Sequence, residues 1–138
     1  MSRGIVGDIV VVDTDVVSFF FKGDTRASLY QSHLDGRLRI IAAQTRAELE
    51  RWTLARNWGA RRRAAFRNFL KDFLLAEADE TICLRWAEVK DDGDRQGHPV
   101  SSVDAWIAAT ALAYDAPLVT HNRKDFENVQ GLIVLSEN

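Results

Sequence analysis

The feature that most constrains the fold is the apolar run Ile9–Val12, which leads directly into Asp13 and Asp15. Isoleucine and valine are β-branched and favour strands, and an uninterrupted apolar run is typical of a strand covered on both faces. Carboxylates at the end of such a strand lie at the carboxyl edge of a parallel sheet, where open α/β folds bind ligands. Further carboxylates that follow other strands are therefore expected to meet Asp13 at the same edge.

The rest of the chain alternates strand-like and helix-like segments. After the first strand, strands are expected at 38–42, 81–84, 117–120 and 132–135, a polar loop at 91–99, and a long Ala-rich helix at 101–115. Residues 66, 69, 70, 73 and 74 have the spacing of one core-facing helical stripe. The alternation predicts an α/β fold with three layers (α/β/α) and a mainly parallel central sheet. The length of 138 residues fits a single domain, 1–138.

Composition predicts where the protein works. Cys83 is the only cysteine, so it cannot form an intramolecular disulfide, which fits a reducing compartment. Residues 1–7 are too short and too polar for a signal peptide. The most apolar segment, 103–114, contains Asp104 and is too short to span a bilayer. The expectation is a soluble cytoplasmic protein with no membrane association.

Charge is unevenly distributed along the chain. The whole chain has a formal net charge of −2, but the segment 45–71 has eight basic and two acidic residues, a net charge of +6. Within it Arg63, Arg67 and Lys71 recur every four residues. Like charges at that spacing cost a helix about 0.2–0.5 kcal/mol per pair, so helix stability does not explain the row. It is either a surface that faces a polyanion or a solvated helix face, and both readings stay open.

Three further acids fall where a parallel sheet would bring them to Asp13. Glu48 follows the second strand, Asp104 lies in the first turn of the Ala-rich helix, and Asp125 follows the strand at 117–120. Each acid also has a structural explanation. Thr45-x-x-Glu48 and Ser101-x-x-Asp104 match the capping box of a helix start, and Asp13 could cap the next helix. Asp125 could be a turn residue.

Taken together, the acids favour a metal site. Four carboxylates at one edge would repel one another and raise one another's pKa values, and a bound divalent cation would remove that cost. An all-oxygen ligand set selects Mg²⁺ or Mn²⁺ over zinc. The sequence contains no phosphate-binding glycine loop, no dinucleotide-binding motif and no serine-hydrolase elbow.

Four segments in order, 12–18, 45–49, 97–112 and 118–126, resemble the motifs of the PIN domain, specifically the VapC-type ribonuclease toxins of bacterial toxin–antitoxin pairs. In the first motif, Asp15 replaces a residue that is more often asparagine. The fourth acid of the family lies at the Asn122 or the Asp125 position, and only Asp125 is acidic here.

The resemblance implies an endoribonuclease that uses Mg²⁺ (or Mn²⁺) to activate water for RNA cleavage. The implied metal-binding and catalytic residues are Asp13, Glu48, Asp104 and Asp125. Supporting polar contacts are expected from Thr14, Asp15, Ser18, Thr120 and Asn122, with Thr14, Ser18 and Thr120 bonding to the carboxylates. RNA contacts are expected from Arg63, Arg67 and Lys71. The implied partners are the RNA substrate, a cognate antitoxin protein and a second copy of the chain in a homodimer.

Two other functions fit parts of the sequence. Residues 9–17 also match the opening motif of haloacid-dehalogenase-type phosphatases, in which Asp13 would be the nucleophile and Asp15 the acid/base. The rest of that family's pattern fits poorly, because no convincing lysine motif follows. The second alternative is a non-catalytic binding module with a PIN-like fold, although all four acids are present.

Overall fold

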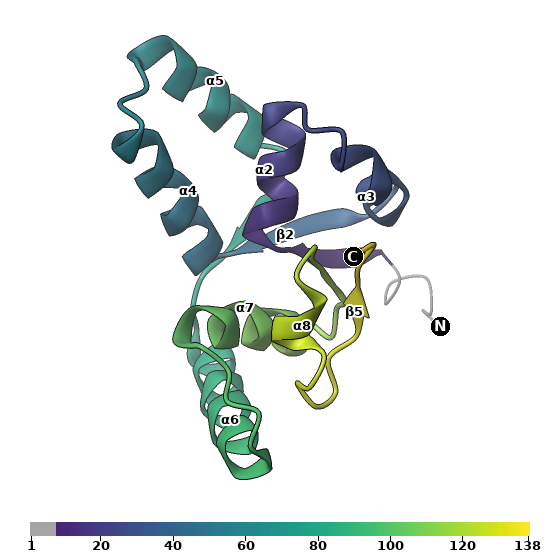
Figure 1. Cartoon of the computed structure of the whole chain (residues 1–138). Coiled ribbons are helices and arrows are strands. Elements are labelled where there is room, and N and C mark those ends of the chain that lie inside the picture. Colours follow the sequence, from purple (N-terminus) through teal and green to yellow (C-terminus); the bar gives the residue numbers. More distant parts are fainter. Residues whose placement is uncertain (1–7) are drawn as a thin grey trace.

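The computed structural model describes residues 8–138, so the expectation about residues 1–7 lies outside the described part of the chain. The helices and strands in chain order are β1 (Ile9–Val12), α2 (Thr14–Lys22), α3 (Ala27–Leu34), β2 (Leu38–Ala42), α4 (Ala43–Ala55), α5 (Ala60–Leu70), β3 (Leu74–Ala76), α6 (Glu80–Gln96), α7 (Ser102–Ala113), β4 (Leu118–Val119), α8 (Arg123–Phe126) and β5 (Val134–Leu135) (Figure 1). No helix among residues 8–138 is both long and apolar enough to cross a membrane.

The sheet has five strands in the order β3-β2-β1-β4-β5, and every neighbouring pair is parallel. The first strand of the chain lies at its centre. Val11 pairs with Ile40 on one side and with Leu118 on the other, and it is fully buried. Because all five strands run the same way, the residues that follow them gather at one edge. The predicted fold class is confirmed.

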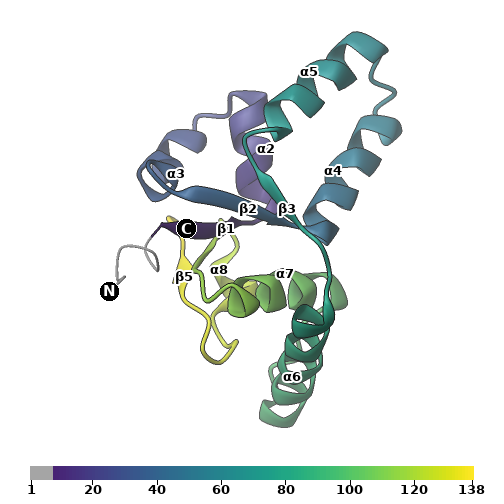
Figure 2. The same cartoon turned by 180° about the vertical axis from the view of Figure 1, so that it is seen from behind.

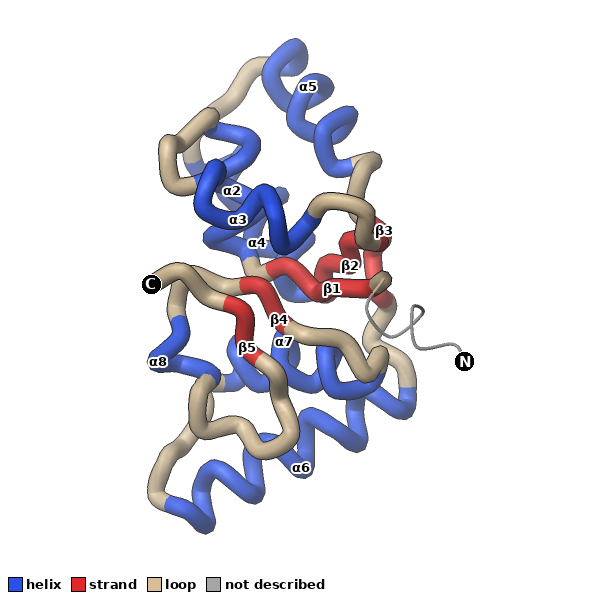
Figure 3. Tube along the Cα trace, turned by 90° about the vertical axis from the view of Figure 1, so that its right-hand side faces the viewer, coloured by secondary structure: helices blue, strands red, loops and turns tan. Residues whose placement is uncertain are grey.

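Helices cover both faces of the sheet, so the fold has three layers. Helices α2 to α5 lie over one face and α6 to α8 over the other, with the strands between them (Figures 1 and 3). Alternate residues of β1 point to opposite faces: Val10 and Val12 join the core under α2–α5, whereas Val11 joins the core under α6 and α7. The apolar run at the start of the chain is buried by both layers.

Two sequence expectations about residues 66–84 are wrong. The third strand is Leu74–Ala76, not 81–84, and the helical stripe ends with α5 at Leu70. Leu74 and Leu75 lie on an edge strand and are about half exposed, so they lack the buried apolar run that marks a central strand. Residues 81–84 are helical because Asp79 starts α6, its Oδ1 accepting the Ile82 N–H at 2.9 Å.

The expected loop 91–99 is mostly helical as well, since α6 continues to Gln96. Gly93 lies inside this helix for a steric reason. A Cβ at this position would lie 2.8 Å from the carbonyl oxygen of His98, so a side chain would push the following turn away. Gly97 ends the helix in the left-handed region, with φ of 76°. The short connection that remains leads directly to Ser101 and α7.

Candidate active site at the carboxyl edge of the sheet

Three of the predicted acids line one cavity of about 350 Å³ at the carboxyl edge of the sheet: Asp13, Glu48 and Asp104. Asp13 follows β1 directly, Glu48 lies in the second turn of α4, and Asp104 lies in the first turn of α7. Four of the five predicted supporting residues line the same cavity: Thr14, Asp15, Ser18 and Asn122. The end of β1 and the N-terminal halves of α2, α4 and α7 thus bring residues that are far apart in the sequence into one cavity.

Asp13 is buried, and both of its carboxylate oxygens accept hydrogen bonds. Oδ1 accepts from the Thr14 N–H at 2.8 Å, which caps α2, and Oδ2 accepts from the Thr120 hydroxyl at 2.7 Å. Burial, followed by the charge of Asp15, nevertheless raises the pKa of Asp13 to about 7, against the lowering effect of the two hydrogen bonds. The charged form is therefore costly here unless a cation compensates it.

Asp15 connects the start of α2 to the segment between β4 and α8. Its Oδ1 accepts from the Val16 N–H at 2.7 Å, and its Oδ2 accepts from the His121 N–H at 3.2 Å. Burial raises the pKa of Asp15 above its usual value. Asp15 therefore makes backbone contacts that fix the site, and its charge adds to the repulsion around Asp13.

Glu48 is held by a threonine and not by a helix start. Its Oε1 accepts the Thr14 hydroxyl at 2.7 Å, and the Thr14 and Thr45 hydroxyl oxygens are 3.1 Å apart. Helix α4 begins at Ala43, directly after β2, with Ala42 at its N-cap. The prediction of a capping box at Thr45 and Glu48 is therefore wrong, and helix capping does not explain the position of Glu48.

Asp104 has both a structural contact and an unfavourable charge environment. Ser101 caps α7, its Oγ accepting the Asp104 N–H at 3.2 Å, as the sequence predicts. The pKa of Asp104 is raised, first by burial and then by the charges of Asp125 and Glu48, although Ser101 lowers it. Acids from three different elements thus repel one another across this site.

Asp125 lies beside the cavity and does not line it. It lines a neighbouring hollow, to which Asp104 also belongs. The Asn122 side-chain amide donates a hydrogen bond to Asp125 Oδ2, and Asn122 itself lines the main cavity. Asp104 therefore lines both hollows, whereas Asp125 lines only the second. Ser18 also differs from expectation, because its hydroxyl donates to the backbone carbonyl of Asp15 at 2.9 Å and not to a carboxylate.

The donor set fits a hard divalent cation by its chemistry. All the side chains concerned offer oxygen atoms. The pKa values of Asp13 and Asp104 are raised first by burial and then by neighbouring acids, and a bound cation would offset the cost of the buried negative charge. Within residues 8–138, however, no three His, Cys, Asp or Glu side chains are already arranged to hold a metal ion. The acids are gathered, but their ligand distances are not preformed.

The predicted RNA-binding row lies apart from the residues that line the cavity. Arg63 and Arg67 are on α5, and Lys71 follows its last residue. Together α4 and α5 form a hairpin that projects from the sheet (Figure 2). Arg67 Nη2 donates to Glu50 Oε1 at 3.3 Å, so the row is partly neutralised by α4.

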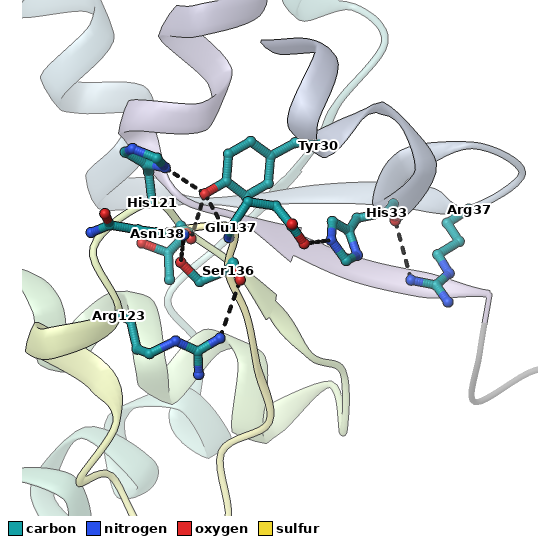
Figure 4. Close-up of polar contacts among 9 residues, drawn as sticks. Tyr30, His33, Arg37, His121, Arg123, Ser136, Glu137 and Asn138 are labelled. Atoms are coloured by element: carbon teal, nitrogen blue, oxygen red, sulfur yellow. Dashed lines mark hydrogen bonds and ion pairs between the residues drawn. The ribbon is translucent and has the colours of Figure 1, made fainter. Parts of the chain in front are cut away.

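A polar network at the carboxyl terminus holds the segment that follows β4 (Figure 4). The Tyr30 hydroxyl lies 2.5 Å from His121 Nδ1 and accepts the Glu137 N–H at 3.0 Å, while His33 Nε2 and Glu137 Oε2 are 2.8 Å apart. The His121 N–H in turn binds Asp15. Tyr30, which is fully buried, therefore supports the segment that supplies Thr120 to Asp13.

Five residues that line the cavity were not assigned to it from the sequence, and three of them are aliphatic: Leu49, Val103 and Ile107. The other two, Lys22 and Trp52, line it together with the acids. Their spacing was the available signal: Trp52 lies four residues after Glu48 on α4, and Lys22 lies seven residues after Asp15 on α2, which places each on the helix face of its acid. The same spacing also describes ordinary packing between helices, so the pattern alone does not single them out.

Comparison with known proteins identifies the family. The family model of the PIN domain matches residues 10–132. Ribonuclease VapC1 of Haemophilus influenzae (strain R2866) is 39% identical over 54 residues, which cover 39% of this chain and 40% of that protein. The tRNA(fMet)-specific endonuclease VapC of Shigella flexneri is 25% identical over 122 residues, 88% of this chain and 92% of that protein. The match to VapC1 thus spans less than half the length of that relative.

Solved structures agree on the fold. VapBC-1 from nontypeable Haemophilus influenzae has a chain with a TM-score of 0.80 and 25% identity, covering 93% of this chain and 97% of that one. VapBC2 from Rickettsia felis, bound to a promoter DNA fragment, has a chain with a TM-score of 0.79 and 19% identity. The match covers 94% of this chain and 99% of that one. These findings do not favour the phosphatase interpretation. With the family model matching most of its length, the chain belongs to the PIN domain family.

Proposed function

We propose that the protein is a VapC-type toxin, an endoribonuclease that depends on Mg²⁺ or Mn²⁺ and works as a single domain. One observation carries the proposal: Asp13, Glu48 and Asp104 line a single cavity, and Asp13 and Asp104 have raised pKa values there. The similarity to proteins named as VapC ribonucleases supports the same activity. Because its substrate would be cellular RNA, the proposed place of action is the cytoplasm.

The roles that we assign to the acids are those that the family resemblance implies. Asp13 and Asp104 would hold the metal ion, with Glu48 and Asp125 completing its surroundings. When bound, the ion makes nearby water more acidic and offsets the negative charge of the scissile phosphate. Glu48, which lines the cavity, would orient the attacking water and take its proton, or Asp125 would do so from the neighbouring hollow. The Thr120 hydroxyl keeps Asp13 in place through its hydrogen bond of 2.7 Å, and the Thr14 hydroxyl does the same for Glu48.

The proposed partners are RNA, an antitoxin protein and a second copy of the chain. The similar solved structures are described as VapBC complexes, which supports a cognate antitoxin for this protein. Contacts to RNA phosphates are proposed for Arg63, Arg67 and Lys71, where Lys71 is exposed at the end of α5. The homodimer is proposed from the family resemblance.

The test is cleavage of total RNA by purified wild-type protein and by Asp104→Asn, each with Mg²⁺ and with EDTA. We expect the wild-type protein to produce defined cleavage ends only with Mg²⁺, and Asp104→Asn to produce none while remaining folded. Asp24→Asn is the matched control, because Asp24 is also acidic but pairs with Arg26 at 2.8 Å and does not line the cavity. Cleavage by the wild-type protein in EDTA, or full activity of Asp104→Asn, would overturn the proposal.

A further inference from the structure

The acidic cavity has a second end with different chemistry. Helices α2 and α4 lie against each other, and each sends residues from successive turns into the cavity. The turns near the sheet contribute Asp15 and Glu48, and the turns farther out contribute Lys22 and Trp52. Because a helix rises about 1.5 Å per residue, Trp52 lies about 6 Å farther along α4 than Glu48. Lys22, with its ammonium group, and Trp52, with its indole, thus line the same cavity as the carboxylates.

The Trp52 ring is half-buried and is contacted by cations. Lys22 Nζ lies 4.5 Å from the centre of the ring, and Arg56 Cζ lies 5.1 Å from it. Lys22 is itself exposed, so a ligand can displace it from the ring at little cost. Trp58, 5.1 Å from Trp52 between ring centres, packs against it. The indole of Trp52 is therefore supported by a second ring while it lines the cavity.

The base and the phosphate of an RNA nucleotide are complementary to the indole and the ammonium group, respectively. The base has a flat face that stacks on an indole, and the phosphate is an anion that pairs with an ammonium group. The cavity of about 350 Å³ lies within the size range of small-molecule binding sites. The bases of a duplex are stacked on one another, whereas those of single strands and loops are free to stack on an aromatic side chain.

We propose that Trp52 and Lys22 form a subsite for one nucleotide of single-stranded RNA next to the bond that is cleaved, with the base stacked on Trp52 and a phosphate paired with Lys22. The inference rests on the proposed nuclease function and adds a preference for unpaired RNA. Trp52 would favour unpaired over paired nucleotides, and it takes no part in proton transfer.

The test measures binding of a labelled single-stranded RNA of mixed sequence, about 12 nucleotides long, in EDTA so that no cleavage occurs. We expect Trp52→Leu to weaken binding about 5- to 150-fold, the range that loss of one stacked base corresponds to. Trp52→Phe should keep most of the affinity, because its ring still stacks. The same RNA annealed to its complement should bind wild-type protein and Trp52→Leu equally. Tyr114→Leu is the matched control, since it removes an exposed ring outside the cavity.

Two further readouts separate a binding role from a packing role. RNA should quench the tryptophan fluorescence of the wild-type protein, and Trp52→Phe should lose most of that quenching. Lys22→Gln should lower the slope of log affinity against log salt by about 1, because one phosphate contact is lost. If Trp52→Leu does not fold, Trp52→Phe and Lys22→Gln decide the question.

The inference would be overturned by unchanged quenching in Trp52→Phe together with an unchanged salt slope in Lys22→Gln. It would also be overturned if folded Trp52→Leu bound single-stranded RNA as tightly as the wild-type protein does. Wild-type cleavage of RNA with Mg²⁺ shows in each case whether the nuclease function itself holds. If the wild-type protein cleaves and these variants bind normally, only the subsite is wrong. If it does not cleave, the proposed function fails and the subsite fails with it.

Discussion

Helix α4 carries two glutamates, Glu48 and Glu50, whose surroundings are opposite. Burial alone would raise the pKa of Glu50, but hydrogen bonds from Arg46 at 2.9 Å and Arg67 at 3.3 Å outweigh it and lower the pKa. Glu48, on the cavity side, accepts a hydrogen bond from a neutral threonine and adds its charge to that of Asp104. On the hairpin, two arginines neutralise Glu50, whereas in the cavity Glu48 lies near other acids, and no basic side chain among residues 8–138 forms an ion pair with it. A site that binds a cation is expected to show this difference.

The largest expected effect comes from removing the most unfavourable charge. In Asp13→Asn, RNA cleavage should fall about 100-fold or more, while the metal-free protein becomes more stable at pH 8. The pKa of Asp13 is raised from 3.8 to about 7, so between these values the folded chain holds a proton that the unfolded chain releases. The contribution of Asp13 to the free energy of unfolding therefore falls as pH rises from about 4 to about 7, by a few kcal/mol.

Urea denaturation of the wild-type protein and Asp13→Asn between pH 4 and 8, without divalent metal, measures this contribution. The difference in the free energy of unfolding should grow with pH up to about 7 and then level off. Glu50→Gln is the control for loss of a carboxylate outside the cavity. Parallel profiles for the wild-type protein and Asp13→Asn would show that burial does not penalise the charge of Asp13.

The next effect concerns the network that supports the cavity. Tyr30→Phe removes the buried hydroxyl that meets His121 and Glu137, at a cost of about 1–3 kcal/mol because these partly buried hydrogen bonds are lost. We also expect slower cleavage, because the segment that holds Thr120 against Asp13 becomes less fixed. Gln31→Ala on the exposed side of α3 is the control for this helix. If Tyr30→Phe lowers the free energy of unfolding but cleaves RNA at the wild-type rate, the network has only a structural role.

A smaller effect is expected on the hairpin. Replacing Arg63, Arg67 and Lys71 together with glutamine should flatten the dependence of RNA affinity on salt, because fewer counterions are released on binding. Arg85→Gln with Arg95→Gln, on the exposed surface of α6, is the comparison variant. An unchanged slope in the triple variant would make the row a solvated helix face.

The smallest effect is expected when Glu50 on α4 is replaced. Glu50→Gln should cost about 1 kcal/mol or less in the free energy of unfolding, because its ion pairs are partly exposed. It should also tighten RNA binding slightly by leaving Arg46 and Arg67 free for phosphates. Weaker RNA binding in Glu50→Gln would show that these ion pairs position the hairpin.

The positions of Asp13 and Asp104 could be predicted because short-range signals fix them. A buried strand must be followed by a turn at the carboxyl edge, and Ser101 marks the start of the helix that presents Asp104. Strand β3 could not be found in the same way, because Leu74 and Leu75 lie on an exposed edge and continue the apolar spacing of α5. Where burial does not separate strand from helix, the hydrophobic pattern is ambiguous.

The interior of the site depends on long-range contacts that no local pattern contains. The hydrogen bond from Thr120 to Asp13 joins residues 107 positions apart, and Thr14 meets Glu48 across 34 positions. Asp125 lines a separate hollow because the short helix α8 begins after Asn122. Such placements follow from how the elements pack, and the sequence alone predicts only which strand end each residue follows.

The most direct test of the acidic cavity as a cation site is thermal unfolding of the wild-type protein and Asp13→Asn at pH 8 as Mg²⁺ is added. Without Mg²⁺ the variant should unfold at the higher temperature, because it lacks the buried charge. Added Mg²⁺ should raise the unfolding temperature of the wild-type protein and leave that of the variant nearly unchanged. Equal Mg²⁺ responses in the two proteins, or none in either, would show that Asp13 does not help to hold a cation in this cavity.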